Sequence, residues 1–280
     1  MTRVRVALLQ AQSGIEPAAN AARLVEAVEQ AAAGGAAMLF TPEMSGMIDR
    51  DRERALAKAR REEQDEVLAA VRAAAARARI WVHLGSLAVL GEGGKLANRG
   101  FVIDDSGEVR ARYDKIHLFD VDLPTGESWR ESAMYAAGSE AVVVAGTPVG
   151  TLGLTICYDL RFPGLFERLS EAGADVIAVP AAFTVPTGQA HWSVLLRARA
   201  IEAEAFVVAA AQAGLHEDGR ATYGHSLVAD PWGAVIVELD DAPRLAFAEL
   251  DLERIGDVRS RIPVLKHRRA IRRIDKASVN

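Results

Sequence analysis

Short runs of β-forming apolar residues alternate with amphipathic segments along most of this chain, and this alternation is typical of the α/β class. We count about a dozen candidate strands and four or five candidate helices, with helices separating several of the strands. The clearest candidate strands span residues 4–10, 36–43, 80–90, 96–104, 140–145, 149–157 and 174–183. We therefore expect an α/β fold whose sheets are covered by helices on their outer faces, although periodicity does not decide between one sheet and two.

The helical segments are recognised by apolar spacing and by their stop signals. Ala21, Leu24, Val28 and Ala31 recur at helical spacing before Gly34 and Gly35, which end the helix. The charged, alanine-rich stretch 51–78 is predicted to be one helix, and another is predicted to begin at about Pro163. The segment 190–205 is predicted to be helical with one apolar face formed by Val194, Ala198, Ile201 and Ala205.

Composition and charge narrow the classes of function. The net charge of −5 argues against general attraction to nucleic acid or to an anionic membrane, and no window has the ~20 apolar residues of a membrane span. The single cysteine excludes an internal disulfide, which favours a reducing compartment and a cytoplasmic location. No linker or repeat divides the chain, so we expect a single domain over 1–280 with a basic C-terminal tail, 258–280.

The only cysteine, Cys157, stands in the stretch GLTICYDLRFP at the end of an apolar run. Because Pro163 suits the first turn of a helix, Cys157 is placed where a strand stops and a helix begins. Ligands bind at the carboxyl ends of strands in α/β sheets, and a helix N-terminus favours a thiolate. A lone cysteine after an apolar strand is, on the other hand, often an inert buried side chain.

Two charged residues stand in comparable positions. Glu43 follows a strand in LFTPEMSG, and Lys115 lies among apolar and aromatic residues in YDKIHLFDVDLP. Taken singly, they are equally well explained as a surface carboxylate and a lysine whose stem covers apolar surface. Other catalytic motifs are missing: the sequence has no G-x-S-x-G elbow, and its six histidines form no H-E-x-x-H pair, so we expect no metal.

In order and spacing, the stretches FTPEMSG, YDKIHLFDVDLP and LTICYDLRFP resemble the Glu, Lys and Cys motifs of the nitrilase superfamily of carbon–nitrogen hydrolases. The resemblance continues through VPAAFTVPTGQAHWSVLLRARAIE, GRATYGHSLVADPWG and IPVLKHRR, and thus covers nearly the whole chain. Within the superfamily the chain looks most similar to the Nit branch, which contains deaminated glutathione amidase and ω-amidase. The resemblance implies a four-layer α-β-β-α sandwich, a homodimer or higher homo-oligomer, a small-molecule amide as substrate and no cofactor.

The same resemblance implies roles for individual residues. Glu43 would be the general base, Lys115 the cation that stabilises the transition state and Cys157 the nucleophile, with the backbone N–H of Tyr158 as a second oxyanion donor. A further glutamate beside the lysine matches Glu131 in SWRES, in a better context than the nearby Glu127.

Substrate contacts are expected after the cysteine and after the strand that follows it. Arg161 is placed to bind a substrate carboxylate, Phe183 to form an apolar wall, and Thr187 and His191 to supply polar contacts. Arg161 is alternatively a structural partner of Asp159 or Glu167.

Other functions remain open from the residues alone. A nitrilase or an N-carbamoyl amide hydrolase would use the same three residues. A nucleic-acid-binding module would rely on the basic tail RRAIRRIDK, which has no interleaved aromatic residues and belongs to an acidic protein. A catalytically silent scaffold is the third alternative.

Overall fold

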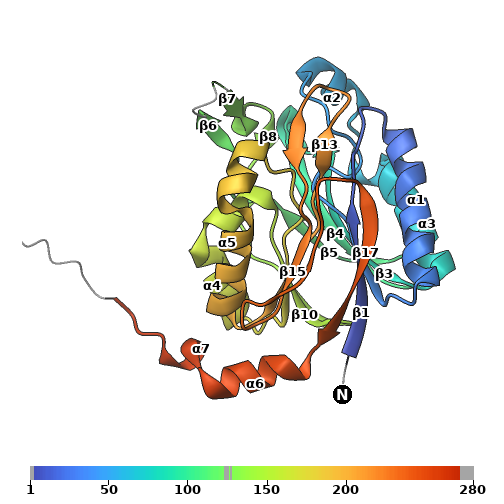
Figure 1. Cartoon of the computed structure of the whole chain (residues 1–280). Coiled ribbons are helices and arrows are strands. Elements are labelled where there is room, and N and C mark those ends of the chain that lie inside the picture. The colour runs from blue at the N-terminus through green and yellow to red at the C-terminus, as the bar shows by residue number, and fades with distance from the viewer. Residues whose placement is uncertain (1–2, 123–125, 127, 272–280) are drawn as a thin grey trace, which may run out of the picture.

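Two β-sheets lie face to face between two pairs of helices and form the body of the protein (Figure 1). The structure is a computed structural model that describes residues 3–122, 126 and 128–271. The expected α/β fold, a four-layer α-β-β-α sandwich, is confirmed. No helix among these residues combines the length and the apolar character that a membrane crossing requires.

The first sheet is mixed, with parallel pairing of β1, β2 and β3 at its centre. Its strands, in spatial order, are β17 (Arg244–Asp251), β1 (Arg3–Gln10), β2 (Met38–Phe40), β3 (Trp81–Leu90), β4 (Leu96–Ile103) and β5 (Val109–Asp114), and β8 (Tyr135–Ala136) also pairs with β4.

The second sheet repeats this plan, with parallel pairing of β10, β11 and β12. Its order is β16 (Val235–Glu238), β15 (Leu227–Ala229), β12 (Phe206–Ala209), β11 (Val176–Ala178), β10 (Gly150–Leu154) and β9 (Val143–Thr147). Two small hairpins, β6 (Asp120–Asp122) with β7 (Ser128–Arg130) and β13 (Ala213–Leu215) with β14 (Ala221–Tyr223), stand at one end of the sandwich (Figure 1).

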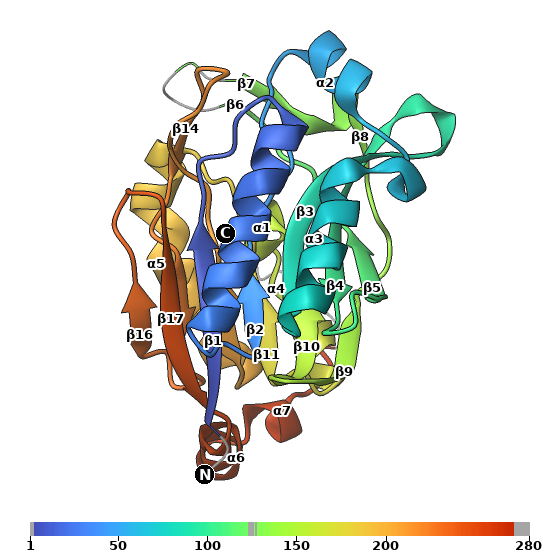
Figure 2. The same cartoon turned by 90° about the vertical axis from the view of Figure 1, so that its right-hand side faces the viewer.

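Helices cover the outer face of each sheet. Helices α1 (Pro17–Ala33) and α3 (Glu66–Ala78) lie side by side over the first sheet (Figure 2), and α4 (Pro163–Glu171) and α5 (Val185–Ala203) cover the second. Successive side chains of β1 point to opposite faces of the first sheet. Val6 and Leu8 belong to the core between the two sheets, whereas Ala7 packs with α1 and α3.

Two helical predictions need correction. The stretch 51–78 is not one helix but α2 (Arg52–Lys58), a 3₁₀ turn η1 (Glu62–Gln64) and α3. Asp51 and Asp65 each cap a new helix through a side-chain hydrogen bond, and the intervening Arg60 forms a β-bridge with Val89.

The apolar face predicted for α5 is not the face that packs against the sheet. Val194 and Ile201 are 68% and 50% exposed. The helix instead buries Trp192, Leu196 and Ala200 against the second sheet. This helix face thus presents two large apolar side chains to solvent, because the fold of the single chain does not bury them fully.

The basic C-terminal segment runs along the end of the sandwich opposite the two hairpins (Figure 1). It forms α6 (Glu253–Arg261) and α7 (Val264–His267), and residues 272–280 lie outside the described part. Arg259 donates to the carbonyl of Ala174 at 2.7 Å, and Arg268 donates to Ser170 Oγ at 3.1 Å. At least two arginines of this basic segment therefore bind to the body of the protein.

Candidate active site

The predicted site residues converge at one end of the sandwich, where strands of both sheets finish. Glu43 follows β2, Lys115 follows β5, and Cys157 follows β10. The two sheets approach each other closely here at Gly85 of β3. A Cβ at this position would lie 2.2 Å from the carbonyl oxygen of Thr41 and 2.4 Å from Pro180 Cβ, so only glycine admits both neighbouring segments.

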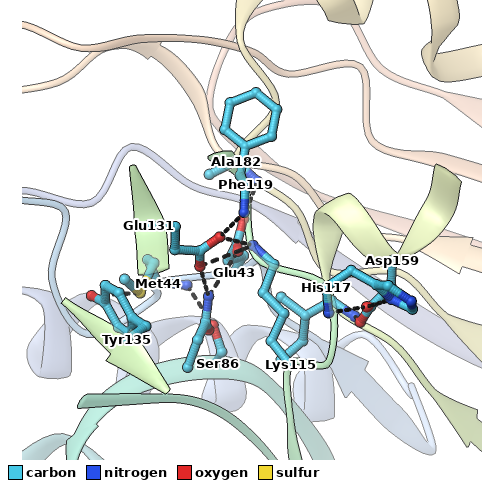
Figure 3. A network of polar contacts seen from close by, with 12 residues as sticks. Glu43, Met44, Ser86, Lys115, His117, Phe119, Glu131, Tyr135, Asp159 and Ala182 are labelled. Carbon is cyan, nitrogen blue, oxygen red and sulfur yellow. Dashed lines mark hydrogen bonds and ion pairs between the residues drawn. The ribbon is translucent and has the colours of Figure 1, made fainter. Parts of the chain in front are cut away.

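Lys115 lies between two carboxylates in a buried site (Figure 3). Its Nζ is 2.9 Å from Glu43 Oε1 and 2.9 Å from Glu131 Oε2, and the Lys115 residue is only 2% exposed. Asn98 of β4 donates to Oε1 of Glu43 at 2.9 Å and to Oε1 of Glu131 at 3.2 Å. The structure thus brings Glu131 to Lys115, while Glu127 lies outside the described residues.

Each carboxylate also accepts a hydrogen bond from a backbone N–H group. Ala182 donates to Oε2 of Glu43 at 2.9 Å, and Phe119 donates to Oε2 of Glu131 at 2.7 Å. Because each carboxylate has a lysine, an amide and a backbone donor, both are fixed in position rather than free to rotate.

Cys157 begins a short 3₁₀ helix, η4 (Cys157–Arg161), in a left-handed backbone conformation with φ of 50°. Such a conformation is unusual for a residue with a Cβ and is often found at functional sites. The N–H of Cys157 donates to Pro180 O at 2.9 Å and that of Asp159 to Ile156 O at 3.1 Å. The N–H of Tyr158 lies between them in the first turn of η4, where helices leave donors without intrahelical acceptors.

The charges of this cluster set its resting protonation state. Burial alone would raise the pKa of Glu43, but the Lys115 ammonium and hydrogen bonds from Cys157, Lys115 and Asn98 together outweigh it and hold that pKa below the ordinary value. Burial alone would lower the pKa of Lys115, yet the Glu131 and Glu43 carboxylates raise it well above the ordinary value. Burial raises the pKa of the Cys157 thiol, and the negative charge of Glu43 raises it further against the opposing effect of Lys115. The resting site therefore holds a neutral thiol beside a carboxylate and an ammonium group.

Asp159 is a buried carboxylate that ties the cysteine turn to the lysine segment, and sequence reasoning gave it no such part. Its Oδ2 accepts from Tyr113 Oη at 2.6 Å and from Ile156 N at 2.8 Å, while its Oδ1 accepts from His117 N at 3.1 Å. Tyr113 and His117 flank Lys115 in the chain, so this one side chain fixes the spacing between the segments that carry Cys157 and Lys115.

A cavity of about 510 Å³ opens beside these residues. Glu43, Lys115 and Cys157 line it, as do Phe183 and Thr187 among the predicted substrate contacts. Arg161 and His191 do not line the cavity. They lie behind its wall, where the Arg161 guanidinium carbon is 5.5 Å from the centre of the Phe183 ring and its Nη1 is 3.3 Å from His191 Nδ1.

The alternative partners of Arg161 do not hold it. No ion pair joins Arg161 to Asp159 or Glu167 in the described part of the chain, since Asp159 is used as above and Glu167 lies near Arg268. The guanidinium of Arg161 thus has no carboxylate partner among the residues placed by the structure.

Asn98 is a further site residue that sequence reasoning did not single out. It is 1% exposed in the middle of a strand in which most neighbours are buried and apolar. A polar amide in such a run is a detectable signal, because buried amides need partners.

As for metals, the structure shows no cluster of three or more potential ligands among residues 3–122, 126 and 128–271.

Comparisons with known proteins agree on one family. The model of the carbon-nitrogen hydrolase family matches residues 5–260 of this chain. The chain is 39% identical over 274 residues to the deaminated glutathione amidase of Yersinia enterocolitica, and this covers 97% of the chain and 95% of that protein.

Solved structures resemble the whole sandwich. The crystal structure of the C. elegans NitFhit protein matches with a TM-score of 0.89 and 38% identity, covering 95% of this chain and 65% of that one. An amidase variant from Nesterenkonia sp. AN1 matches with a TM-score of 0.76 and 26% identity over 94% of this chain and 95% of that one. That amidase carries the acetamide moiety of fluoroacetamide covalently bound to its active-site cysteine.

Proposed function

Since the chain belongs to the carbon–nitrogen hydrolase family and is an amidase of the nitrilase superfamily, we propose that Cys157 is its nucleophile, assisted by Glu43 and Lys115. The observation that carries this proposal is the 2.9 Å contact between Lys115 Nζ and Glu43 Oε1 in a buried site beside the neutral Cys157 thiol. A thiol needs a proton acceptor and an electrostatic partner for the oxyanion, and this arrangement supplies both.

In the first half of the reaction, Glu43 accepts the thiol proton while Cys157 Sγ bonds to the amide carbon. The carbonyl oxygen becomes an oxyanion, which the Lys115 ammonium and the N–H of Tyr158 stabilise. Glu43 then gives its proton to the nitrogen, the C–N bond breaks, and the amine leaves. Cys157 remains as a thioester.

In the second half, Glu43 accepts a proton from water as the water oxygen attacks the thioester carbon. The tetrahedral intermediate again places its oxyanion beside Lys115, the C–S bond breaks, and the proton returns to sulfur. The carboxylic acid product leaves and the thiol is restored. Glu131 holds Lys115 charged and oriented through both halves, as its contacts of 3.1 and 2.9 Å support.

We further propose that the substrate is a small amide that carries a carboxylate. The relative from Yersinia enterocolitica acts, by its name, on deaminated glutathione. The cavity wall includes Arg50 and Arg52, neither of which forms an ion pair within the described residues, on a chain whose net charge is −5. Such a local excess of positive charge favours an anionic substrate. Arg161, with Thr187 and His191 beside the Phe183 wall, remains the proposed site for one carboxylate.

The test uses a panel of amides, nitriles and N-carbamoyl compounds with the wild type and single variants. We expect wild type to release ammonia or amine from carboxylated amides most rapidly, and Cys157→Ala to lose turnover completely. Glu43→Gln and Lys115→Met should each lower kcat by about 100-fold or more. Glu131→Gln should be severe, whereas Glu127→Gln should be mild.

Mass spectrometry with a slow amide should find the acyl group on the peptide that contains Cys157. An active Cys157→Ala protein would overturn the proposed nucleophile. Faster turnover of nitriles or carbamoyl compounds than of any amide would overturn the proposed substrate class.

We also propose a homodimer, a single domain over 1–280 and a cytoplasmic location. The dimer is supported by exposed large apolar side chains on α5 and on the segment that leads into β16, which we call the α5–β16 face: Val194, Ile201, Trp232, Val235 and Ile236. Ile201 packs on Gly233, next to Trp232, so the helix and the turn before β16 are continuous in this surface. A reducing location is supported by the single free cysteine.

A further inference from the structure

Arg220 presents its guanidinium directly to the cavity, whereas that of Arg161 lies behind the cavity wall. It lies between β13 and β14, and its side chain is 18% exposed on the cavity wall. The guanidinium carbon is 4.6 Å from the centre of the Trp129 ring, which also lines the cavity. An arginine stacked on an indole is pre-organised, because its planar fork is already held in one orientation.

The donors of this pair are largely unused within the described residues. Arg220 Nε and Trp129 Nε1 are buried without a hydrogen-bond partner. The neighbouring carboxylate, Asp218, forms an ion pair with Arg220 at 3.7 Å from Nε, but this distance is too long for a hydrogen bond, and its Oδ1 accepts from the backbone N–H of Arg220. Buried donors without partners are costly, and an acceptor group on a ligand would offset that cost.

Arg220 and Arg161 terminate one series of aromatic contacts along the cavity. From the Trp129 ring under Arg220, the series passes to Phe119 at 6.3 Å and then to Tyr158 at 5.1 Å. Tyr158 lies 5.9 Å from the Arg161 guanidinium carbon. All three rings line the cavity, with the Arg220 guanidinium on the cavity wall at one end of the series and the Arg161 guanidinium behind the wall at the other.

The hairpin that bears Arg220 is anchored to the Glu43 segment. Gln212, just before β13, donates to the Glu43 carbonyl at 2.9 Å, and His216 in the hairpin contacts the carbonyl of Ser13 at 2.9 Å. Arg161, in contrast, belongs to the cysteine turn itself. In the proposed reaction Glu43 protonates the departing nitrogen, so the amine part of the substrate extends toward the Glu43 side of the cavity.

We propose that Arg220, stacked on Trp129, binds a carboxylate on the amine part of the substrate, so that the preferred substrates are amides with one carboxylate on each side of the C–N bond. This inference rests on the proposed function and makes it more specific. It assigns Arg161 to the acyl-side carboxylate and Arg220 to the amine-side carboxylate.

Four matched amides test this assignment: propanamide, succinamate, N-propanoylglycine and N-succinylglycine. They carry no carboxylate, an acyl-side carboxylate, an amine-side carboxylate and both. Arg220→Gln should lower kcat/KM about 10- to 100-fold for the two glycine amides, mainly through KM, and about 2-fold or less for the other two. Arg161→Gln should show the complementary pattern, with the loss on succinamate and N-succinylglycine.

Two further variants control for charge and geometry. Arg77→Gln removes an arginine that is 59% exposed on α3 and should leave all four ratios unchanged. Arg220→Lys keeps the charge but not the planar fork, so it should retain only part of the preference. Equal losses on all four amides, a loss that follows the acyl-side carboxylate, or no loss would each overturn the assignment of Arg220.

A binding measurement separates this inference from the reaction mechanism. Calorimetry with Cys157→Ala should detect N-succinylglycine, and adding Arg220→Gln should weaken its Kd about 10- to 100-fold. If binding of N-succinylglycine depends on Arg220 but the wild type hydrolyses none of the amides, the proposed function alone would be overturned. Binding that ignores Arg220 would overturn this inference alone.

Discussion

Cys157 combines a strained backbone with a neutral thiol, and both features bear on how it reacts. Its φ of 50° costs about 1–3 kcal/mol for a residue with a side chain and requires a rigid surrounding structure. That structure includes the bond from its N–H to Pro180 and the carboxylate of Asp159 beneath the turn. Cys157 lines the cavity, and in the proposed mechanism its proton leaves only when Glu43 takes it.

The protonation state predicts an unusual pH profile for a cysteine enzyme. The pKa of Glu43 lies below its ordinary value of 4.5, because the charge of Lys115 and the hydrogen bonds to the carboxylate together outweigh the effect of burial. The pKa of Cys157 lies well above its ordinary value of 9.0, because burial and the Glu43 charge raise it. We expect kcat/KM for a neutral amide to be flat between about pH 5 and about pH 9. It should fall in more acidic solution, where Glu43 gains the proton that it must be free to accept.

Initial rates with propanamide across this range provide the check, together with the thiolate absorbance of the resting enzyme. A rate that climbs between about pH 7 and about pH 9 in step with thiolate formation would contradict a neutral resting thiol.

Asp159 is predicted to be a positioning residue for the reaction. Asp159→Asn replaces one acceptor oxygen by an amide NH2 group, a donor that would face an O–H or N–H donor of Tyr113, Ile156 or His117. We expect kcat to fall about 10- to 100-fold with little change in KM, because alignment of Cys157 and Lys115 is lost while the cavity remains.

The matched control is Asp175→Asn, which affects an ion pair with Arg259 away from the cavity. It should leave kcat unchanged. A rise in KM with normal kcat in Asp159→Asn would show that Asp159 supports substrate binding instead.

At the scale of elements, β3 carries a buried histidine whose charge state affects stability. Burial lowers the pKa of His83 from 6.5 to about 3, so it is neutral in the folded state. The unfolded chain binds a proton there as the pH falls below 6.5, whereas the folded chain does not, so acid favours unfolding. Between pH 7 and pH 5 this residue should remove about 2 kcal/mol from the free energy of unfolding.

Urea unfolding of wild type and His83→Leu at both pH values measures this effect. The loss of stability between pH 7 and pH 5 should be smaller by about 2 kcal/mol in the variant, whatever its stability at pH 7. Equal losses in the two proteins would mean that His83 takes up its proton in the folded state as well.

The elements also show what sequence patterns can and cannot predict. The start of α4 at Pro163 and the place of Cys157 at a strand–helix junction follow from local chemistry, so both were predictable. The break between α2 and α3 depends on caps that compete with a continuous helical pattern, which is why 51–78 was predicted as one helix.

Long-range contacts explain the rest of the site. Asn98 meets Glu43 across 55 positions of the chain, and Asp159 meets Tyr113 across 46. Periodicity carries no information at such separations, whereas the family resemblance predicts which residues act on the substrate. The stacking of Arg220 on Trp129 likewise joins two segments whose patterns are unrelated.

On the scale of the whole molecule, the α5–β16 face is the feature that the isolated chain leaves unexplained. Val194 and Ile201 stand two helical turns apart on one side of α5, and burying such side chains contributes about 1.5–3 kcal/mol each. Because a twofold contact buries the same residues on both subunits, two positions per chain count twice. A second copy of the chain is therefore the occupant that we expect.

Ile201→Glu should convert the dimer into a monomer of 30.0 kDa, as measured by light scattering during size-exclusion chromatography. The new carboxylate would be buried without a partner in the dimer but solvated in the monomer, so the penalty falls on association alone. Leu215→Glu is the matched control, since Leu215 is 67% exposed on β13, outside this face, and should leave the dimer intact. A wild type that already runs as a monomer at micromolar concentration would contradict the dimer. An Ile201→Glu protein that stays dimeric would mean that the subunits meet at another surface. Retention of kcat in the monomeric variant would further show that one chain holds the complete set of reacting groups, as the cluster of Glu43, Lys115 and Cys157 within a single sandwich predicts.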